Sequence, residues 1–327
     1  MKDVIDYLRS ASEPWVRYRT MIDLRDLSAQ DPDVAAARAE MIAHPLFQGL
    51  FAEMQTWPGK VLSSHKSAGQ LYHKLEFLAD AGVKKDDFDS ARIVTDLAGG
   101  ISGEGLFQMC ANIPTHFGGP GEDTRAWALC DAPILHYAAA KMNLIDDGAL
   151  IPGLKYLISL VRENGWPCAV SPELGKFRGP GRKADPCPYA TLIMLKLLSL
   201  SDEYRNSEAA QFGVESLLNL WETSIDQHPY MFYMGTDFRK LKAPFIWYDI
   251  LHVADTLSLF ETARSDPRFI DMTNLIFSKA DGDGLYGAES VWKAWKGWDF
   301  GEKGTPSPWI TFLVTRIEHR MSGNALK

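Results

Sequence analysis

The sequence predicts an all-α protein, and two observations carry that prediction. Apolar residues recur at helical spacing through almost every long segment of the 327 residues, whereas alternation with period two is nearly absent. Similar apolar segments also return at a nearly constant interval along the chain. Strand signals are confined to short pieces such as residues 231–234. We therefore expect a single domain of paired helices that spans residues 1–327.

The repeat consists of two kinds of helix. Five apolar segments begin near a Pro, Ser or Asp, about 60 residues apart, and a similar segment precedes them; the six cover residues 14–27, 64–80, 124–144, 186–200, 244–260 and 307–320. More amphipathic helices lie between them, at roughly residues 31–43, 87–97, 147–163, 207–221 and 267–279. The pattern predicts about six helical hairpins.

The starts of the inner helices are rich in aromatic and chemically active residues, namely Trp127, Cys130, Asp185, Cys187, Tyr189, Trp247, Tyr248, Asp249, His252 and Trp309. Helical hairpins stack as an open solenoid or close into a ring. In a closed ring these helix ends converge on one central cavity, a form typical of apolar ligand sites. The sequence thus predicts an (α/α) toroid, with Trp127, Trp247 and Trp309 in contact with a substrate. The alternative is that these aromatic residues belong to an ordinary core.

Composition excludes several classes of function. The chain has 34 Lys and Arg against 42 Asp and Glu, a net charge of −8, which argues against a binder of nucleic-acid backbones. No uninterrupted apolar stretch reaches the ~18–20 residues that a membrane helix needs. The first residues are charged rather than apolar, so we expect a cytoplasmic protein. The four cysteines show no CxxC spacing and are expected to be reduced.

A basic, glycine-rich loop precedes the third repeat segment of the five. Arg178, Arg182 and Lys183 lie in this loop and are predicted to meet an anionic group of a substrate at the following helix N-terminus. The next residues are Asp185 and Pro186, and Pro at the first helical position makes Asp185 a predicted N-cap.

Cys187 is expected in the first turn of that helix. There the helix dipole and the neighbouring cations favour a thiolate, the form that binds zinc or attacks carbon. The following inner segment supplies Asp249 and His252, three residues apart and therefore on one helix face. A carboxylate there is also able to support a metal-binding imidazole.

An Asp-x-Cys pair followed 63–67 residues later by Asp-x-x-His and then Leu-Ser resembles the zinc site of protein prenyltransferase β subunits. The matching residues are Asp185, Cys187, Asp249 and His252, followed by Leu257-Ser258. The wider resemblance is to the α/α-toroid superfamily of terpenoid cyclases and protein prenyltransferases. Asp185-Pro186-Cys187-Pro188 stands where the cyclases have their Asp-x-Asp-Asp acid motif, which disfavours acid-initiated cyclisation.

The resemblance implies a zinc ion on Asp185, Cys187 and His252, and a diphosphate contact from Arg182. It also implies roles on the preceding inner helix, where Trp127 and Cys130 match the family and Arg125 stands beside the position of a diphosphate-binding residue. A tyrosine follows the ligand cysteine, here displaced by one to Tyr189. Three protein ligands leave a fourth position on zinc for water or substrate.

The favoured function is a zinc-dependent transferase, similar to prenyltransferases, that acts on a small apolar molecule with or without a diphosphate. One alternative is a metal-independent isomerase, hydratase or lyase that uses Asp185, Asp249 and Tyr248 as acid and base. Others are a carbohydrate-active α/α barrel with carboxylates such as Asp123, Asp249 and Glu302, or a non-catalytic scaffold. No protein partner is identified.

Overall fold

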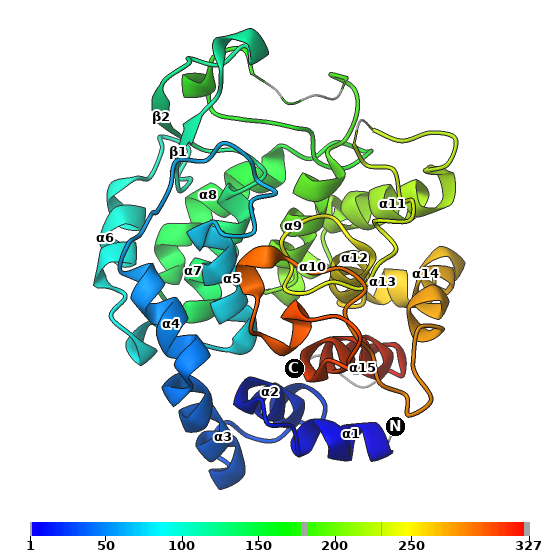
Figure 1. Cartoon of the computed structure of the whole chain (residues 1–327). Helices are drawn as coiled ribbons and strands as arrows, with labels where there is room; N and C mark the ends of the chain where they lie inside the picture. The colour runs from blue at the N-terminus through cyan, green and yellow to red at the C-terminus, as the bar shows by residue number, and fades with distance from the viewer. Residues whose placement is uncertain (1, 178, 180–181, 230, 324–327) are drawn as a thin grey trace. The chain divides into compact units, whose positions relative to one another are not determined.

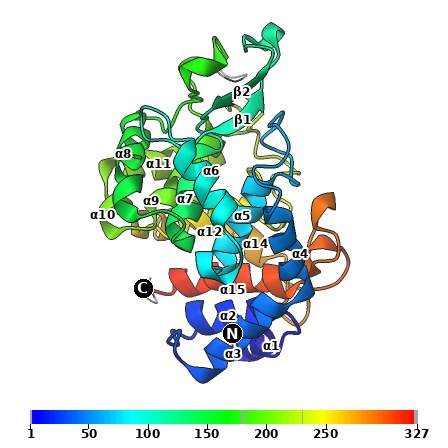
Figure 2. The ribbon, with the colours of Figure 1, turned by 90° about the vertical axis from the view of Figure 1, so that its left-hand side faces the viewer.

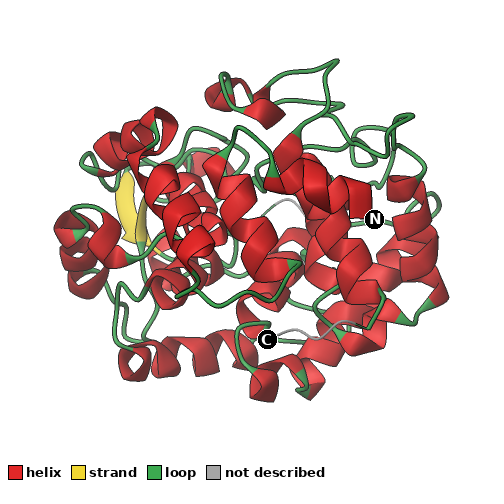
Figure 3. Ribbon diagram, turned by 90° about the horizontal axis from the view of Figure 1, so that it is seen from below, coloured by secondary structure: helices red, strands yellow, loops and turns green. Residues whose placement is uncertain are grey.

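The computed structural model describes residues 2–177, 179, 182–229 and 231–323. Helices make up 52% of the structure, and within the described ranges they comprise fifteen α-helices against one small two-stranded sheet (Figure 3). This confirms the all-α prediction. The chain divides into two compact units, one formed by residues 1–51 with 235–327 (unit 1) and one by residues 52–234 (unit 2). The closed toroid and the single 1–327 domain stay predictions.

Unit 1 joins the two ends of the chain. Helix α2 packs on α3, and α12 packs on both α14 and α15 (Figure 2). Ion pairs between side chains connect these helices, because Arg316 of α15 pairs with Asp255 of α12 and with Asp23 of α2. The helices are α1 (Lys2–Arg9), α2 (Pro14–Asp23), α3 (Pro32–Ala43), α12 (Ile250–Leu257), α13 (Glu261–Arg264), α14 (Pro267–Phe277) and α15 (Pro308–Met321), and α4 (Pro45–Met54) runs into unit 2.

Unit 2 is built on a row of helices in which α5 packs on α7, α7 on α9 and α9 on α11 (Figure 1). A buried cluster ties the row together, since the Lys196 ammonium of α9 donates to Glu76 and Asp80 of α5 at 2.7 and 2.8 Å. The helices are α5 (Leu71–Ala81), α6 (Ala91–Gly99), α7 (Ala132–Met142), α8 (Asp147–Ser159), α9 (Pro188–Leu198), α10 (Asp202–Arg205) and α11 (Glu208–Thr223).

The sheet also belongs to unit 2. Strand β1 (Met109–Asn112) pairs antiparallel with β2 (Asp123–Ala126), in the register that places Cys110 opposite Arg125. The strand signal at residues 231–234 was wrong, because that stretch forms a turn and irregular chain. Short 3-10 turns occur at Lys85–Asp87, Thr115–Phe117, Pro172–Leu174, Lys293–Trp295 and Asp299–Gly301.

Each of the eleven predicted repeat helices has a counterpart, but three inner helices begin six to eight residues later than predicted. They are α5, α7 and α12. In all three cases the polar and aromatic residues at the predicted start lie in turns and extended chain that lead into the helix. Many of the candidate site residues therefore lie in the loops that precede these helices. Of the helices in the described ranges, none is both long and apolar enough to cross a membrane.

Candidate functional site

Three of the four cysteines meet in unit 2 although they are far apart in the sequence. The side chains of Cys130, Cys168 and Cys187 interact with one another, since each of the three thiols has its pKa shifted by the other two. Cys187 is buried, whereas Cys130 and Cys168 are half-buried, and all are free thiols. We call these three residues the thiol cluster.

Backbone pairing outside the regular sheet brings the three segments together. On one side of the central segment 166–171, Leu129 N–H donates to Ala169 O and Ser171 N–H donates to Trp127 O, both at 2.9 Å. On the other side Cys187 N–H donates to Trp166 O at 2.7 Å. The segment that carries Cys168 is thus held between the segments that carry Cys130 and Cys187.

The register of these pairs explains why the side chains meet. Ala128 is paired with Val170 in an antiparallel bridge, so Cys130, two residues on, comes opposite Cys168. Pro167 is bridged to Pro186, which makes Cys168 and Cys187 diagonal neighbours. Opposite and diagonal neighbours on antiparallel strands share one face, where their side chains interact.

A histidine and a carboxylate lie beside the thiol cluster. His65 Nε2 is 2.9 Å from Asp131 Oδ2, and the Asp131 side chain is only 3% exposed. Asp131 is fixed in turn, because its Oδ1 accepts a hydrogen bond from Ala128 N–H. A carboxylate on one ring nitrogen orients an imidazole and leaves the other nitrogen for chemistry. Asp131 therefore holds the His65 ring through Nε2.

The cluster favours a thiolate at Cys168. The interactions with Cys130 and with Cys187 lower the pKa of the Cys168 thiol, and the charge of His65 lowers it further, against the effect of burial. The interaction with Cys168 instead raises the pKa of Cys130. For Cys187, the interaction with Cys130 lowers the pKa, but the interaction with Cys168 and burial outweigh it, so the pKa is raised. These directions favour a thiolate at Cys168 beside two protonated thiols.

This result corrects two predictions. Helix α9 begins at Pro188 and Cys187 is its N-cap residue, so Asp185 is not the N-cap and Cys187 is not in the first turn. The thiolate preference falls on Cys168 instead of Cys187, because their interaction lowers the pKa of Cys168 and raises that of Cys187. Asp185 closes a turn of its own, in which its Oδ2 accepts a hydrogen bond from Arg182 N–H at 3.1 Å.

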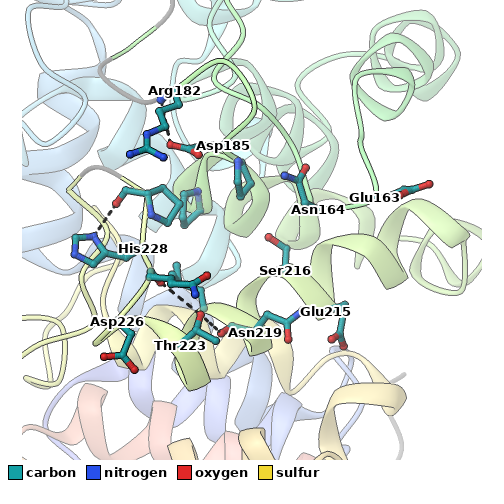
Figure 4. A pocket seen from close by; sticks show the side chains of 15 residues that line it. Glu163, Asn164, Arg182, Asp185, Glu215, Ser216, Asn219, Thr223, Asp226 and His228 are labelled. Atoms are coloured by element: carbon teal, nitrogen blue, oxygen red, sulfur yellow. Dashed lines mark hydrogen bonds between the residues drawn. The ribbon is translucent and has the colours of Figure 1, made fainter.

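Arg182 and Asp185 line an open pocket of about 900 Å³ between the segment before α9 and helix α11 (Figure 4). Pro186 and Pro188, on either side of Cys187, also line it. The labelled side chains are polar, and they include the carboxylates Glu163, Glu215 and Asp226. Polar and apolar side chains thus both line the pocket at Arg182, a predicted substrate-binding residue, and at Asp185, a predicted metal ligand.

The other predicted residues of unit 2 have separate environments. Arg125 pairs with Asp96 at 2.9 Å, and Lys183 is exposed. Trp127 is buried, with its ring against Tyr156. Tyr189 is fully buried in the first turn of α9, and burial raises its pKa well above the ordinary value. Arg178 lies outside the described residues.

The predicted residues of unit 1 surround the start of α12. Asp249 is its N-cap and accepts a hydrogen bond from His252 N–H, so this carboxylate holds the backbone of His252. The His252 ring stacks on Phe245, and its Nδ1 lies 3.0 Å from Trp247 O. Burial raises the pKa of Asp249 to about 7.

The two remaining aromatic residues that were predicted as site residues in unit 1 lie in the core. Tyr248 is buried, with its ring 5.2 Å from that of Phe238. Trp309 is buried against Phe312, and its backbone N–H donates to Asp299. Both rings contribute packing within their own unit.

Each of the zinc ligands that the resemblance implies has protein partners in the structure. Asp185 accepts a hydrogen bond from Arg182 N–H, Cys168 and burial raise the pKa of the Cys187 thiol, and His252 Nδ1 lies 3.0 Å from Trp247 O. Within the described ranges, no three His, Cys, Asp or Glu side chains are arranged to hold a metal ion. The zinc ion and the prenyl transfer stay predictions.

The sequence analysis missed Cys168, His65 and Asp131 as site residues. One signal was available, because Pro-Cys occurs twice, at Pro167-Cys168 and Pro186-Cys187, and these are the two segments that pair. Nothing in the sequence indicated that His65 meets Asp131. Comparison with protein-family models finds no matching family, and comparison with curated proteins finds no matching protein.

Proposed function

We propose that this chain is a thiol-dependent oxidoreductase that reduces small hydroperoxides at Cys168. One observation carries the proposal, namely that the segments of two further thiols flank the segment of Cys168 and that the charge of His65, which pairs with Asp131, acts on the Cys168 thiol. Perturbed titratable groups gathered in one place are typical of functional sites. A thiolate is the reactive form of cysteine, and a second thiol within reach supplies the partner for a disulfide.

In the first step the Cys168 thiolate attacks one oxygen of the hydroperoxide. An S–O bond forms and the O–O bond breaks, so that Cys168 becomes a sulfenic acid. The alkoxide or hydroxide that leaves takes a proton from His65, which Asp131 holds in place. Sulfur is oxidised by two electrons and the peroxide is reduced by two.

In the second step Cys130 or Cys187 resolves the sulfenic acid. The thiol loses its proton to His65 and attacks the Cys168 sulfur; an S–S bond forms, the S–O bond breaks and the oxygen leaves as water. The segments that carry Cys130 and Cys187 are paired with the segment that carries Cys168, so the resolving thiol has only a short distance to cover. An external dithiol then reduces the disulfide by two exchanges and restores the three thiols.

The surroundings of Cys168 favour a small oxidant. The residue is half-buried, and Gly179 of the glycine-rich loop lies directly against its sulfur, since a Cβ at position 179 would be 2.4 Å from Sγ. A hydroperoxide needs only to reach the sulfur, whereas a large substrate needs a cavity around it.

The test is the rate of reaction with hydrogen peroxide, with Cys168→Ser as the variant and Cys110→Ser as the matched control. Cys110 is also a half-buried free thiol, but burial raises its pKa. We expect Cys168 to be oxidised at least 100-fold faster than Cys110, a disulfide from Cys168 to Cys130 or Cys187 in the peptide map, and turnover with dithiothreitol. Equal oxidation rates at Cys168 and Cys110 would overturn the proposal. So would one equivalent of zinc held by the thiols of the purified protein.

A further inference from the structure

A second cavity lies in unit 2, where α7, α8, α10 and the end of α9 meet. Its volume is about 450 Å³, within the ~300–1,000 Å³ that is usual for small-molecule sites. One wall is aliphatic and consists of Leu150, Ile151 and Leu154 from α8, Leu197 from the end of α9 and Leu200 from the turn after it.

The rim of this wall is open to solvent. Ile151 is 43% exposed and Leu200 is 37% exposed, and both are among the few large hydrophobic side chains of the described residues with such exposure. Leu150 and Leu197 continue the same apolar surface into the interior at 7% and 6% exposure. A continuous apolar surface that runs from solvent into a cavity is typical of a binding site for a hydrocarbon chain.

The polar side of the cavity is cationic. Lys84 and Lys141 both line it, and the Lys84 ammonium donates a hydrogen bond to Lys141 O, which holds the two residues together. The other titratable groups in the lining are Asp147, His136 and Tyr204. His136 is 1% exposed and burial lowers its pKa to about 4, so it is neutral at pH 7. Two cations against one carboxylate favour an anionic ligand group.

We infer that this cavity binds a medium-chain amphiphile with a carboxylate head group. The chain lies against Leu150, Leu154 and Leu197, where it leaves water, and the carboxylate meets the ammonium groups of Lys84 and Lys141. This inference is independent of the thiol cluster, because none of the three thiols lines the cavity.

The experiment is calorimetric titration of the whole protein with decanoate, decanol and decylamine, each below its micellar concentration. We expect decanoate to bind at least tenfold more tightly than decylamine, and decanol to lie between them. Equal affinities for all three would overturn the anionic-head assignment, and no decanoate binding at millimolar concentration would overturn the site.

Two variants locate the binding. Ile151→Glu is expected to weaken decanoate binding at least tenfold, whereas the matched control Ile270→Glu changes another exposed isoleucine, 40% exposed on α14 of unit 1, and is expected to have no effect. Lys141→Gln is expected to weaken decanoate about tenfold and to leave decanol unchanged. Equal binding by the Ile151 and Ile270 variants, both with wild-type circular dichroism, would place the ligand elsewhere.

Discussion

His65 and Asp131 form a hydrogen-bonded pair 2.9 Å apart although 66 positions separate them in the sequence. The pair depends on the turn before α7, where Asp131 also caps Ala128 N–H. The charge of His65 acts on Cys168, so the acid–base group and the nucleophile of the proposed reaction come from different parts of unit 2.

Asp131→Asn is expected to slow the reaction of Cys168 with peroxide about 10- to 100-fold, part of the ~10²–10⁴ that general acid–base catalysis contributes. Asparagine keeps the Oδ1 acceptor for Ala128 but presents an amide to His65. The rate is measured by stopped-flow, with Asp123→Asn as control, because Asp123 is exposed on β2.

Further variants distinguish a purely structural role of Asp131 from the proposed positioning of His65. Asp131→Glu restores a carboxylate and should recover part of the rate, and Asp131→Asn combined with His65→Gln should be no slower than His65→Gln alone. Additive losses, or loss of rate that only follows loss of stability, would contradict the positioning role.

Gly179→Ala is expected to disturb Cys168 without removing any thiol. Gly179 has a φ of +74°, which L side chains rarely adopt, and the added Cβ would lie 2.4 Å from Cys168 Sγ. We expect the Cys168 oxidation rate to change at least fivefold. Gly282→Ala is the control, since a Cβ there meets nothing within 4 Å. Identical peroxide kinetics in both variants would show that the loop does not lie against the sulfur.

Lys196→Met is expected to destabilise the chain by about 3–5 kcal/mol, because it leaves the buried carboxylate of Glu76 and the half-buried carboxylate of Asp80 without this cation. The control is Lys240→Met, which removes an exposed pair with Asp237 and should cost less than about 1 kcal/mol. Urea unfolding measures both values. A similar small loss in both variants would mean that the Lys196 cluster is solvated.

Asp249 predicts a pH dependence of stability. Its pKa in the folded chain, about 7, lies above that of an exposed Asp, so the fold favours the protonated carboxyl. The stability that this carboxyl contributes is complete below about pH 4 and is lost as the pH rises through 7. Three pKa units correspond to at most about 4 kcal/mol.

The variant Asp249→Asn removes this titration and keeps the Oδ1 acceptor for His252 N–H. Unfolding free energies are compared at pH 5 and pH 8 for both proteins. We expect the wild type to lose more stability than the variant between these two values. An equal loss in both proteins would indicate that the carboxyl titrates in the ordinary range.

Helical periodicity was enough to predict the helices, because the burial of one helix face produces a regular spacing of apolar residues in the local sequence. It failed at the starts of α5, α7 and α12, where apolar and aromatic residues continue into the preceding loop. There they pack without helical structure, so composition alone does not mark the boundary. The β1–β2 hairpin was not predicted, because the largely exposed strand β2 lacks an alternation of apolar and polar residues.

The candidate site was harder to predict than the fold. The thiol cluster depends on two pairings, Ala128 with Val170 and Pro167 with Pro186, that join distant segments through single bridges. Such isolated pairs leave no periodic pattern in the sequence. Cys187 was identified by local spacing. The lowered pKa of the Cys168 thiol, in contrast, depends only on neighbours that are distant in the sequence and that folding brings together.

The most direct test of the central claim is residue-resolved alkylation of the native protein with limiting iodoacetamide at pH 6, with metal content measured on the same sample. The account predicts that Cys168 is alkylated at least tenfold faster than Cys110 and that the protein carries no stoichiometric metal on its thiols. Preferential alkylation of Cys110, or unreactive thiols that hold one equivalent of zinc, would contradict it.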